Sequence, residues 1–257
     1  MGAADLSVKM VLIVIVGVFL GSFMDAIAGG GGIITVPTYL LAGLPAHFAL
    51  GTNKFSAAIG TFFSTGRFIK NKYVDWVLGV PSIVLAVIGS HFGTRLQLMV
   101  DEKYLKYLLL IVLPVVAFVV LRQRKFPEEP GEIERKKQMA IVWVSSLVVG
   151  AYDGFYGPGT GTFLILLYTA LARMDVLTAG GNTKLSNLAS NVMSITVFLF
   201  NGTVLIPLGL TAAVFSIAGH FIGAGIALKK GAKSIRFVIL IVIALLFAKV
   251  IFEMLTK

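Results

Sequence analysis

Residues 25–32 read DAIAGGGG and residues 153–160 read DGFYGPGT, and both glycine-rich stretches lie within long apolar sequence. Each begins with an aspartate, so that Asp153 in the second stretch is aligned with Asp25 in the first. Glycine permits unusual backbone dihedrals and weakens a helix. Broken helices and charged residues are costly inside a membrane and tend to mark a function there. The pair predicts two helix breaks at membrane depth, one in each half of the chain.

A second pair of matching segments follows the first. Residues 51–56 read GTNKFS and residues 181–186 read GNTKLS, which aligns Lys54 with Lys184. Because both pairs recur in the same order and with nearly the same separation along the chain, we interpret the chain as a duplication of one unit. Internal repeats that contain broken helices are typical of secondary transporters.

The composition indicates a membrane protein. Of the 257 residues, 57% are hydrophobic and 13% are charged, and the mean hydropathy is +0.93. A soluble domain of this length is about half apolar and about a quarter charged. The first apolar stretch, Val8 to Leu20, has no small-residue cleavage site after it, so we expect a retained helix and not a signal peptide. The chain has no cysteine, which excludes disulfides, thiolate metal sites and thiol catalysis.

Apolar segments recur along the chain and predict an all-α integral membrane protein with about 8–10 membrane segments. The predicted segments are residues 7–24, 33–44, 46–66, 74–98, 104–121, 139–152, 161–172, 178–200, 204–228 and 235–254. Two of them, 33–44 and 161–172, have about 12 residues and reach about 18 Å, less than the ~30 Å hydrocarbon core. We expect these two to be short tilted helices or arms of re-entrant hairpins.

One charged stretch divides the chain. Residues 122–137 read RQRKFPEEPGEIERKK and are predicted to link a first transmembrane repeat, residues 1–121, to a second, residues 138–257. The net charge of +10 does not indicate a nucleic-acid partner, because Lys and Arg lie mostly in short loops, where they set orientation. The expected partners are the lipid bilayer and a small anionic substrate, and a homo-oligomer is left open.

The basic loops predict how the chain is oriented in the membrane. The linker 122–137 is assigned to the cytoplasm, and the basic loops around Arg67 and at 229–236 then fall on the same side. The uncharged loop 201–203 and both termini fall on the extracytoplasmic side. The loop after the third segment therefore lies on opposite sides in the two repeats. This predicts inverted-topology repeats, with a substrate site near the midplane.

The glycine-rich stretches are candidate anion sites. If the helices unwind there, the half-helices that begin near Ile33 and Gly161 offer unpaired N–H groups and the positive end of a helix dipole. The alternative is a close helix–helix contact through small residues. No GK[ST] sequence follows either stretch, so a nucleotide-binding loop is excluded. The candidate substrate-binding residues here are Gly30, Gly31, Gly32, Gly159, Thr160 and Gly161.

The two aligned lysines are the candidate cations of this site. Lys54 and Lys184 lie inside segments too apolar to be loops, although a lone lysine at such a depth can also extend its ammonium to the membrane surface. Neutral donors surround both, and the candidates are Asn53, Ser56, Asn182, Thr183, Ser186, Asn187 and Asn191. Two cations with hydroxyl and amide donors are typical of a site for a small oxyanion.

Two other kinds of titratable residue lie in apolar sequence. Asp25 and Asp153 could neutralise the two lysines when no substrate is bound, or take up a proton and couple transport to the proton gradient. The alternative is a helix-end carboxylate near the membrane surface. His91 and His220 are interpreted as hydrogen-bonded core residues, with a proton relay as the alternative. The sequence shows no metal site, and no cofactor is expected.

The stretch AGGGGIITVPTYLLAGLPAHFALGTNKFSAAIGTFFSTGRFIKNKYVDW, residues 28–76, resembles the TauE/SafE family of membrane permeases, also called the sulfite exporter or TSUP family. The resemblance covers nearly the whole chain, and the second half is more degenerate, with GPGTG in place of GGGG. It implies transport of sulfite, sulfoacetate or related sulfonates across the inner membrane of a bacterium, or the plasma membrane of an archaeon.

These observations predict a secondary transporter, an exporter of small sulfur-containing oxyanions that works by alternating access, and not an enzyme. The anion would lie between the two glycine-rich stretches and be held by Lys54 and Lys184. One alternative is an anion channel with the same site. The other is a cation-coupled importer of a neutral or cationic solute, in which Asp25 and Asp153 are the ligands.

Overall fold

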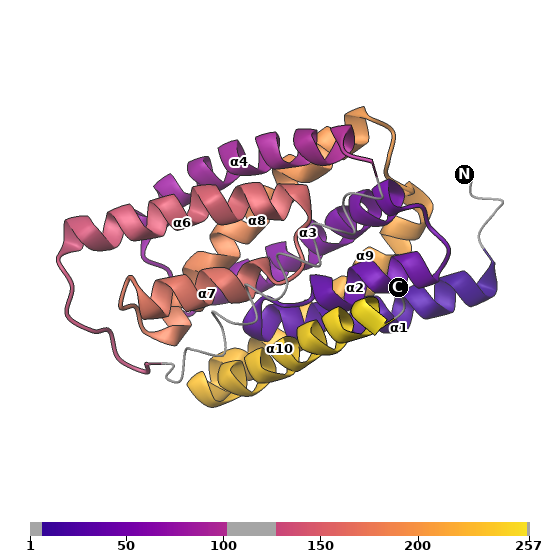
Figure 1. Ribbon diagram of the computed structural model, residues 1–257. Helices are drawn as coiled ribbons and strands as arrows, with labels where there is room; N and C mark the ends of the chain where they lie inside the picture. Colours follow the sequence, from indigo (N-terminus) through magenta and orange to yellow (C-terminus); the bar gives the residue numbers. More distant parts are fainter. Residues whose placement is uncertain (1–6, 102–126, 256–257) are drawn as a thin grey trace.

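The computed structural model describes residues 7–101 and 127–255, and all regular structure in these two ranges is helical. The helices are α1 (Val8–Ala28), α2 (Gly32–Leu41), α3 (Ala46–Lys70), α4 (Trp76–Met99), α6 (Arg135–Phe155), α7 (Thr160–Ala170), α8 (Val176–Phe200), α9 (Ile206–Lys230) and α10 (Ala232–Leu255) (Figure 1). They follow the predicted segments to within a few residues. The predicted segment 104–121 lies outside the described residues.

The last residues of the predicted linker, 122–137, belong to a helix. Helix α6 begins at Arg135, so the basic run Arg135 to Lys137 at the end of the stretch 122–137 is the first turn of a helix. Arg135 reaches back to the first half of the chain, where its guanidinium lies 2.7 Å from the carboxylate of Asp75. Asp75 also caps α4 by accepting from the N–H groups of Val77 and Leu78.

The two short helices are arms of helical hairpins. Helix α2 turns back along the second half of α1, so that a Cβ on Gly17 would meet Thr38 and one on Gly21 would meet Thr35. Helix α7 turns back along α6 in the same way, and Ser146 lies 2.7 Å from the hydroxyl of Tyr168. In Figure 1 the two hairpins enter the bundle from opposite ends, and their tips meet inside it.

The halves of the chain interlock through close helix contacts. Helix α4 packs against α6, and α9 packs against α1, so each contact joins the first half to the second. Glycines make these contacts possible, since a Cβ on Gly93 would clash with the backbone oxygen of Ala151 and one on Gly223 would clash with that of Phe23. Small residues at helix contacts let the backbones approach closely. In a membrane the hydrophobic effect does not drive helices together, so such close packing holds them. Helices α3 and α8 run through the centre of this arrangement (Figure 1).

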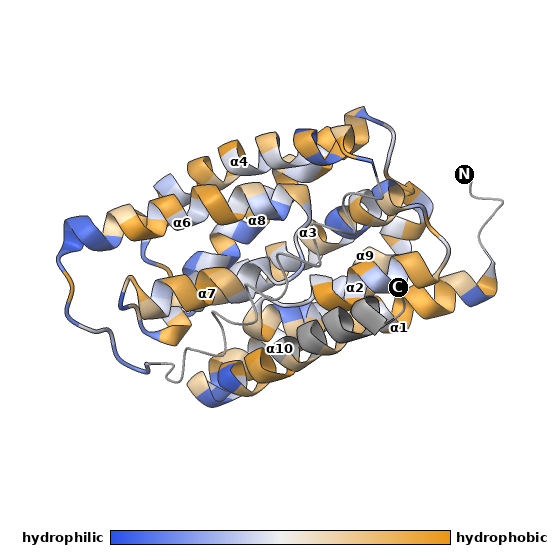
Figure 2. Cartoon of the chain, viewed as in Figure 1, coloured by the Kyte–Doolittle hydropathy of each residue, from blue (hydrophilic) through white to orange (hydrophobic). Residues whose placement is uncertain are grey.

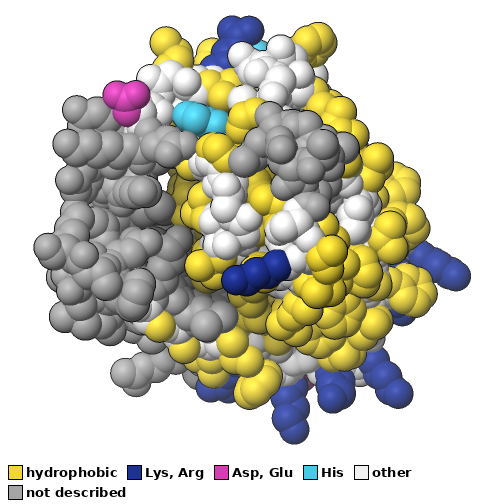
Figure 3. All heavy atoms as spheres, turned by 90° about the vertical axis from the view of Figure 1, so that its right-hand side faces the viewer, with side chains coloured by type: hydrophobic (Ala, Val, Ile, Leu, Met, Phe, Trp, Pro, Cys, Tyr) yellow, Lys and Arg dark blue, Asp and Glu magenta, His cyan; other side chains and the backbone are white. Residues whose placement is uncertain are grey.

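The outer surface is apolar, and the interior contains many polar side chains besides apolar ones. Along α4, the side chains of Val80, Val84, Ile88, Phe92 and Leu96 are spaced by four residues and are 42–66% exposed. The buried face of the same helix carries hydroxyl side chains that are fully buried. Hydrophobic residues make up much of each described helix (Figure 2), and hydrophobic side chains cover much of the described surface at the end where the chain begins (Figure 3). Such large apolar faces indicate contact with lipid.

Four of the described helices, α1, α4, α6 and α9, are long and apolar enough to cross a membrane. Helices α3 and α8 have 25 residues each but carry the lysines and many of the buried polar side chains. The prediction of an all-α membrane protein is confirmed.

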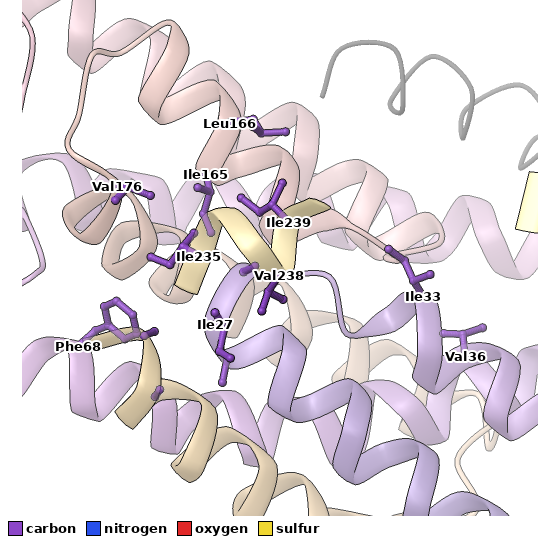
Figure 4. Packing of buried hydrophobic residues seen from close by; sticks show 14 of the residues in the cluster. Ile27, Ile33, Val36, Phe68, Ile165, Leu166, Val176, Ile235, Val238 and Ile239 are labelled. Carbon is purple, nitrogen blue, oxygen red and sulfur yellow. The ribbon is translucent and has the colours of Figure 1, made fainter. Parts of the chain in front are cut away.

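An apolar cluster holds the hairpin tips from one side. Helix α10 places Ile235 and Ile239, both fully buried, against Ile27 near the end of α1 and Ile165 on α7 (Figure 4). The cluster therefore packs around both hairpins at the level where they meet.

Candidate functional site

The first hairpin tip is a helix end built on glycine. Helix α1 ends at Ala28, and Gly29 adopts the left-handed conformation with φ of 77°, which a residue with a Cβ adopts only at a cost. Its N–H donates to the backbone oxygen of Asp25 at 2.7 Å, and the N–H of Gly31 donates to the side chain of Asp25 at 3.2 Å. The start of the short helix α2 therefore binds a carboxylate, as helix N-termini do.

The second tip is also built on glycine, with a different sequence. Gly157 and Gly159 have φ of 96° and 86°, and Gly159 is the residue that precedes α7. The hydroxyl of Tyr152 donates to the backbone oxygen of Pro158 at 2.7 Å and fixes the turn. The turn brings Thr160, the first residue of α7, back over Asp153.

The two tips touch through their backbones. The N–H of Thr162 donates to the backbone oxygen of Gly29 at 3.2 Å, and the Thr162 hydroxyl donates to that of Ala28 at 2.8 Å. A Cβ on Gly161 would lie 2.5 Å from the Cα of Gly29. This contact places the two predicted glycine-rich stretches side by side, and Gly161 takes part in it.

Lys54 lies in the middle of α3 and is paired with the second half of the chain. Its ammonium lies 2.6 Å from Oδ2 of Asp153 and donates to the side-chain oxygen of Asn191 at 2.9 Å. The Lys54 side chain is 4% exposed and that of Asp153 is 3% exposed. A buried charge is stable only when it is paired and hydrogen-bonded, and this ion pair meets both conditions.

The carboxylate of Asp153 is held by three donors. Besides the ammonium of Lys54, the hydroxyl of Thr160 donates to Oδ1 at 2.8 Å and the hydroxyl of Ser190 donates to Oδ2 at 2.5 Å. One cation and two hydroxyls around a carboxylate form a set of ligands for an oxyanion.

Lys184 lies in the middle of α8 and is paired with the first half of the chain. Its ammonium donates to the backbone oxygen of Asp25 and lies 3.4 Å from Oδ2 of the same residue. The two ion pairs are therefore crossed, because each lysine pairs with the aspartate of the other half. His220 on α9 also faces Asp25, with 3.8 Å between Nε2 and Oδ2.

A small cavity lies between the two ion pairs. Its volume is about 30 Å³. The predicted site residues that line it are Asp25, Gly31, Gly32, Asn53, Lys54, Asp153, Thr160, Asn187 and Asn191. The side-chain oxygen of Asn53 is buried there without a hydrogen-bond partner. An unpaired buried acceptor is costly.

Other predicted residues lie outside this cavity. Ser56 is bonded to the hydroxyl of Tyr39 at 2.9 Å, and Ser186 lies 3.4 Å from that of Tyr168. Asn182 donates to the backbone of Thr178 at 3.0 Å, and the Thr183 hydroxyl is buried without a hydrogen-bond partner. Gly30 and Gly159 accept backbone hydrogen bonds from the starts of α2 and α7. Lys184 is not among the lining residues, although its partner Asp25 is.

The structure adds residues that the sequence did not single out as site residues. Ser22, Thr35 and His220 line the cavity, and Ser190 binds Asp153. The spacing of Asn191 from Lys184 predicts a shared helix face, but Asn191 binds Lys54 of the other half. Among the described residues no group of three or more metal-binding side chains is brought together.

Comparisons with known proteins identify the family to which the chain belongs. The family described as "Sulfite exporter TauE/SafE" matches residues 13–250. The chain is similar to "Probable membrane transporter protein ORF9" of Sinorhizobium sp., with 34% identity over 93% of this chain and 91% of that protein. It is similar to a "Probable membrane transporter protein" of Haemophilus influenzae, with 31% identity over 97% of both chains. It is also similar to "Probable membrane transporter protein YfcA" of Escherichia coli K12, with 32% identity over 91% of this chain and 87% of that protein. No solved structure matches the chain.

Proposed function

Because the chain belongs to the sulfite exporter TauE/SafE family, we propose that it exports small sulfur-containing oxyanions, such as sulfite or an organosulfonate, by alternating access. Family membership makes it a membrane transporter and not an enzyme. The substrate, the direction and the mechanism are what we propose.

The observation that carries the proposal is the set of donors around Asp153. The ammonium of Lys54 and the hydroxyls of Thr160 and Ser190 surround a carboxylate that belongs to the protein itself. A sulfite ion or a sulfonate group presents oxygens to the same kinds of donor. We expect the substrate to displace Asp153 from Lys54 and Asp25 from Lys184, and to bind to both ammonium groups.

The size of the cavity supports a conformational step. A volume of about 30 Å³ holds on the order of one or two water molecules, which is less than a sulfite ion occupies. The hairpin tips must therefore separate before the substrate enters. Separation toward one side or the other of the bundle would expose the site alternately, as in transporters built from broken helices.

Two features favour this mechanism over the alternatives. The hydrogen bond from Thr162 to Gly29 holds the two hairpin tips together, which favours a carrier over an open anion channel. Asp25 and Asp153 already face the ammonium groups of the opposite half, which favours an anionic substrate over a cation bound by these carboxylates.

We also propose the orientation that the loop charges predict. The linker 122–137 would be cytoplasmic, the termini extracytoplasmic, and the membrane the plasma membrane of the cell. The entry of the two hairpins from opposite ends of the bundle (Figure 1) supports an inverted relationship between the repeats.

The test is flux into proteoliposomes that contain the purified protein. Labelled sulfite, sulfoacetate, sulfate and chloride are offered to the wild type, to Lys54→Ala and to a control, Lys70→Ala, whose side chain is exposed on the same helix. We expect saturable flux and counterflow of one sulfur oxyanion, lost in Lys54→Ala and retained in the control. Non-saturable chloride flux without counterflow would identify a channel, and no flux of any of these anions would overturn the proposal.

A further inference from the structure

The two halves differ at one titratable position beside the site. Ser90 on α4 and His220 on α9 are separated in the sequence by the same interval as Lys54 and Lys184, so the alignment of the two lysines also aligns these residues. Both side chains are buried, with exposures of 0% and 1%. Equivalent positions of the repeats thus carry a hydroxyl in the first half and an imidazole in the second.

The neighbours of these two residues match as well. Nδ1 of His220 lies 3.0 Å from the hydroxyl of Ser64 on α3, and the hydroxyl of Ser90 lies 2.8 Å from that of Ser194 on α8. Ser64 and Ser194 are separated by the same interval again. The hydrogen bond to a serine hydroxyl is therefore present in both halves, whereas the titratable side chain is present only in the second half.

The imidazole of His220 is held between a hydroxyl and a carboxylate. Nδ1 is bonded to Ser64, which leaves Nε2 facing Oδ2 of Asp25 at 3.8 Å. Close packing fixes the ring, since a Cβ on Gly60 would clash with its Cδ2.

The charged groups around His220 come from three helices. Asp25 lies on α1, Lys184 on α8 bonds to Asp25, and Lys54 on α3 lines the same cavity. The basic residues Lys233 and Arg236 of α10 line a separate groove. Asp25 is therefore the one described carboxylate within ion-pair distance of His220.

We propose that His220 is the proton-binding residue of the transport cycle, which rests on the proposed function. When the substrate anion pairs with the ammonium of Lys184, Asp25 loses the cation with which it is paired. A carboxylate that is largely removed from water is strongly destabilised without a cation. A proton bound at Nε2 turns His220 into an imidazolium ion that replaces Lys184 as the partner of Asp25. One proton binds with one anion, and both are released when the ion pair re-forms, so an exported anion carries one proton out with it.

Because Ser90 cannot take up a proton, the other half has no equivalent of this exchange. When the lysines are taken, Asp153 still has two hydroxyl donors, those of Thr160 and Ser190, whereas Asp25 has one N–H donor, that of Gly31. The cycle is therefore expected to carry a single proton, bound on the Asp25 side.

The experiment measures accumulation of labelled sulfoacetate in proteoliposomes under a pH gradient, with the membrane potential clamped at zero. Coupling to one proton gives about a tenfold accumulation ratio per pH unit, since each tenfold ratio corresponds to about 1.4 kcal/mol. We expect His220→Asn to carry sulfoacetate down its own gradient at a lower rate and to lose the accumulation. The control His91→Asn, whose ring packs against Phe92 away from the ion pairs, should accumulate as the wild type does.

A second measurement is independent of the stability of this variant. Sulfoacetate added to the wild type in weakly buffered detergent solution should cause uptake of one proton per protein, read with a pH indicator, and uptake should be absent in His220→Gln. Sulfoacetate flux without pH-driven accumulation or proton uptake in the wild type would overturn the inference, as would full accumulation in His220→Asn. Absence of any anion flux in the wild type would instead overturn the proposed function.

Discussion

Gly29 and Gly161 come from opposite halves of the chain and touch through their backbones, so that a Cβ on Gly29 would clash with the Cα of Gly161. No side chain separates the two hairpin tips at this point. The hydrogen bond from the N–H of Thr162 to the oxygen of Gly29 holds them together. Any conformational change that opens the site must break this contact.

Gly29→Ala is therefore expected to destabilise the protein and abolish transport. The new methyl group meets backbone atoms that cannot move aside, and φ of 77° adds backbone strain; overpacking alone costs roughly 1–3 kcal/mol. Thermal unfolding of the purified protein and anion flux measure the two effects.

Substitutions at two other glycines separate the effect of the steric clash from that of the backbone strain. Gly43 also has a positive φ, 94°, but no atom within 4 Å of an added Cβ, so Gly43→Ala isolates the strain. Gly66 lies in α3 with open space around it, and Gly66→Ala should stabilise the helix by about 0.5–1 kcal/mol. Normal stability and transport in Gly29→Ala would show that the tips do not meet.

The ion pair of Lys54 and Asp153 should contribute more to transport than to stability. Lys54→Met leaves a buried carboxylate unpaired and should lower the free energy of unfolding by about 3–5 kcal/mol. The double variant Lys54→Met/Asp153→Leu should recover most of that loss, because no buried charge remains, yet transport no substrate. Denaturant unfolding and flux of both variants and the wild type test this, and additive destabilisation or transport by the double variant would contradict it.

Asp153→Asn should tighten binding and slow turnover. If the carboxylate competes with the substrate for Lys54, removing its charge lowers KM for the anion, while the lost competitor slows release and lowers kcat. The matched control is Asp175→Asn, which keeps a good capping residue in front of α8 and should leave both constants unchanged. A raised KM in Asp153→Asn would show that the carboxylate assists binding.

The orientation of the chain can be tested by cysteine labelling, because the sequence contains no cysteine. We expect a membrane-impermeant maleimide to label Asn201→Cys in intact cells and Glu129→Cys only after the cells are permeabilised. Both positions are exposed in the structure. The reverse pattern would invert the proposed orientation, and labelling of both from one side would contradict the predicted number of crossings between them.

The sequence was sufficient to predict the helices and their broken ends. Hydrophobic length predicted the segments, and the glycines predicted the interruptions after Ala28 and before Thr160. The crossed pairing could not be predicted, because both lysines and both aspartates are equivalent in sequence. It depends on how α3 and α8 pack against the opposite hairpin, which is a property of the whole bundle.

The individual polar residues could have been sorted further by helix geometry. Successive residues turn by about 100° around an α-helix, so a residue two positions from a lysine lies about 200° away on the other face. Ser56 and Ser186 occupy that position. Both lie next to a tyrosine hydroxyl and do not line the cavity. Asn187, three positions after Lys184, returns to the lysine face and lines the cavity.

The crossed ion pairs between the halves also bear on how such a chain could arise. A gene that encoded one repeat alone would produce a lysine and an aspartate whose partners lie on another molecule, and its product would have to assemble as a dimer to avoid buried, uncompensated charge. Duplication followed by fusion makes that assembly internal. In the fused chain, loss of the lysine or the aspartate from one half leaves an unpaired charge in the other half. The two halves can therefore diverge in sequence elsewhere but must change together at these four positions.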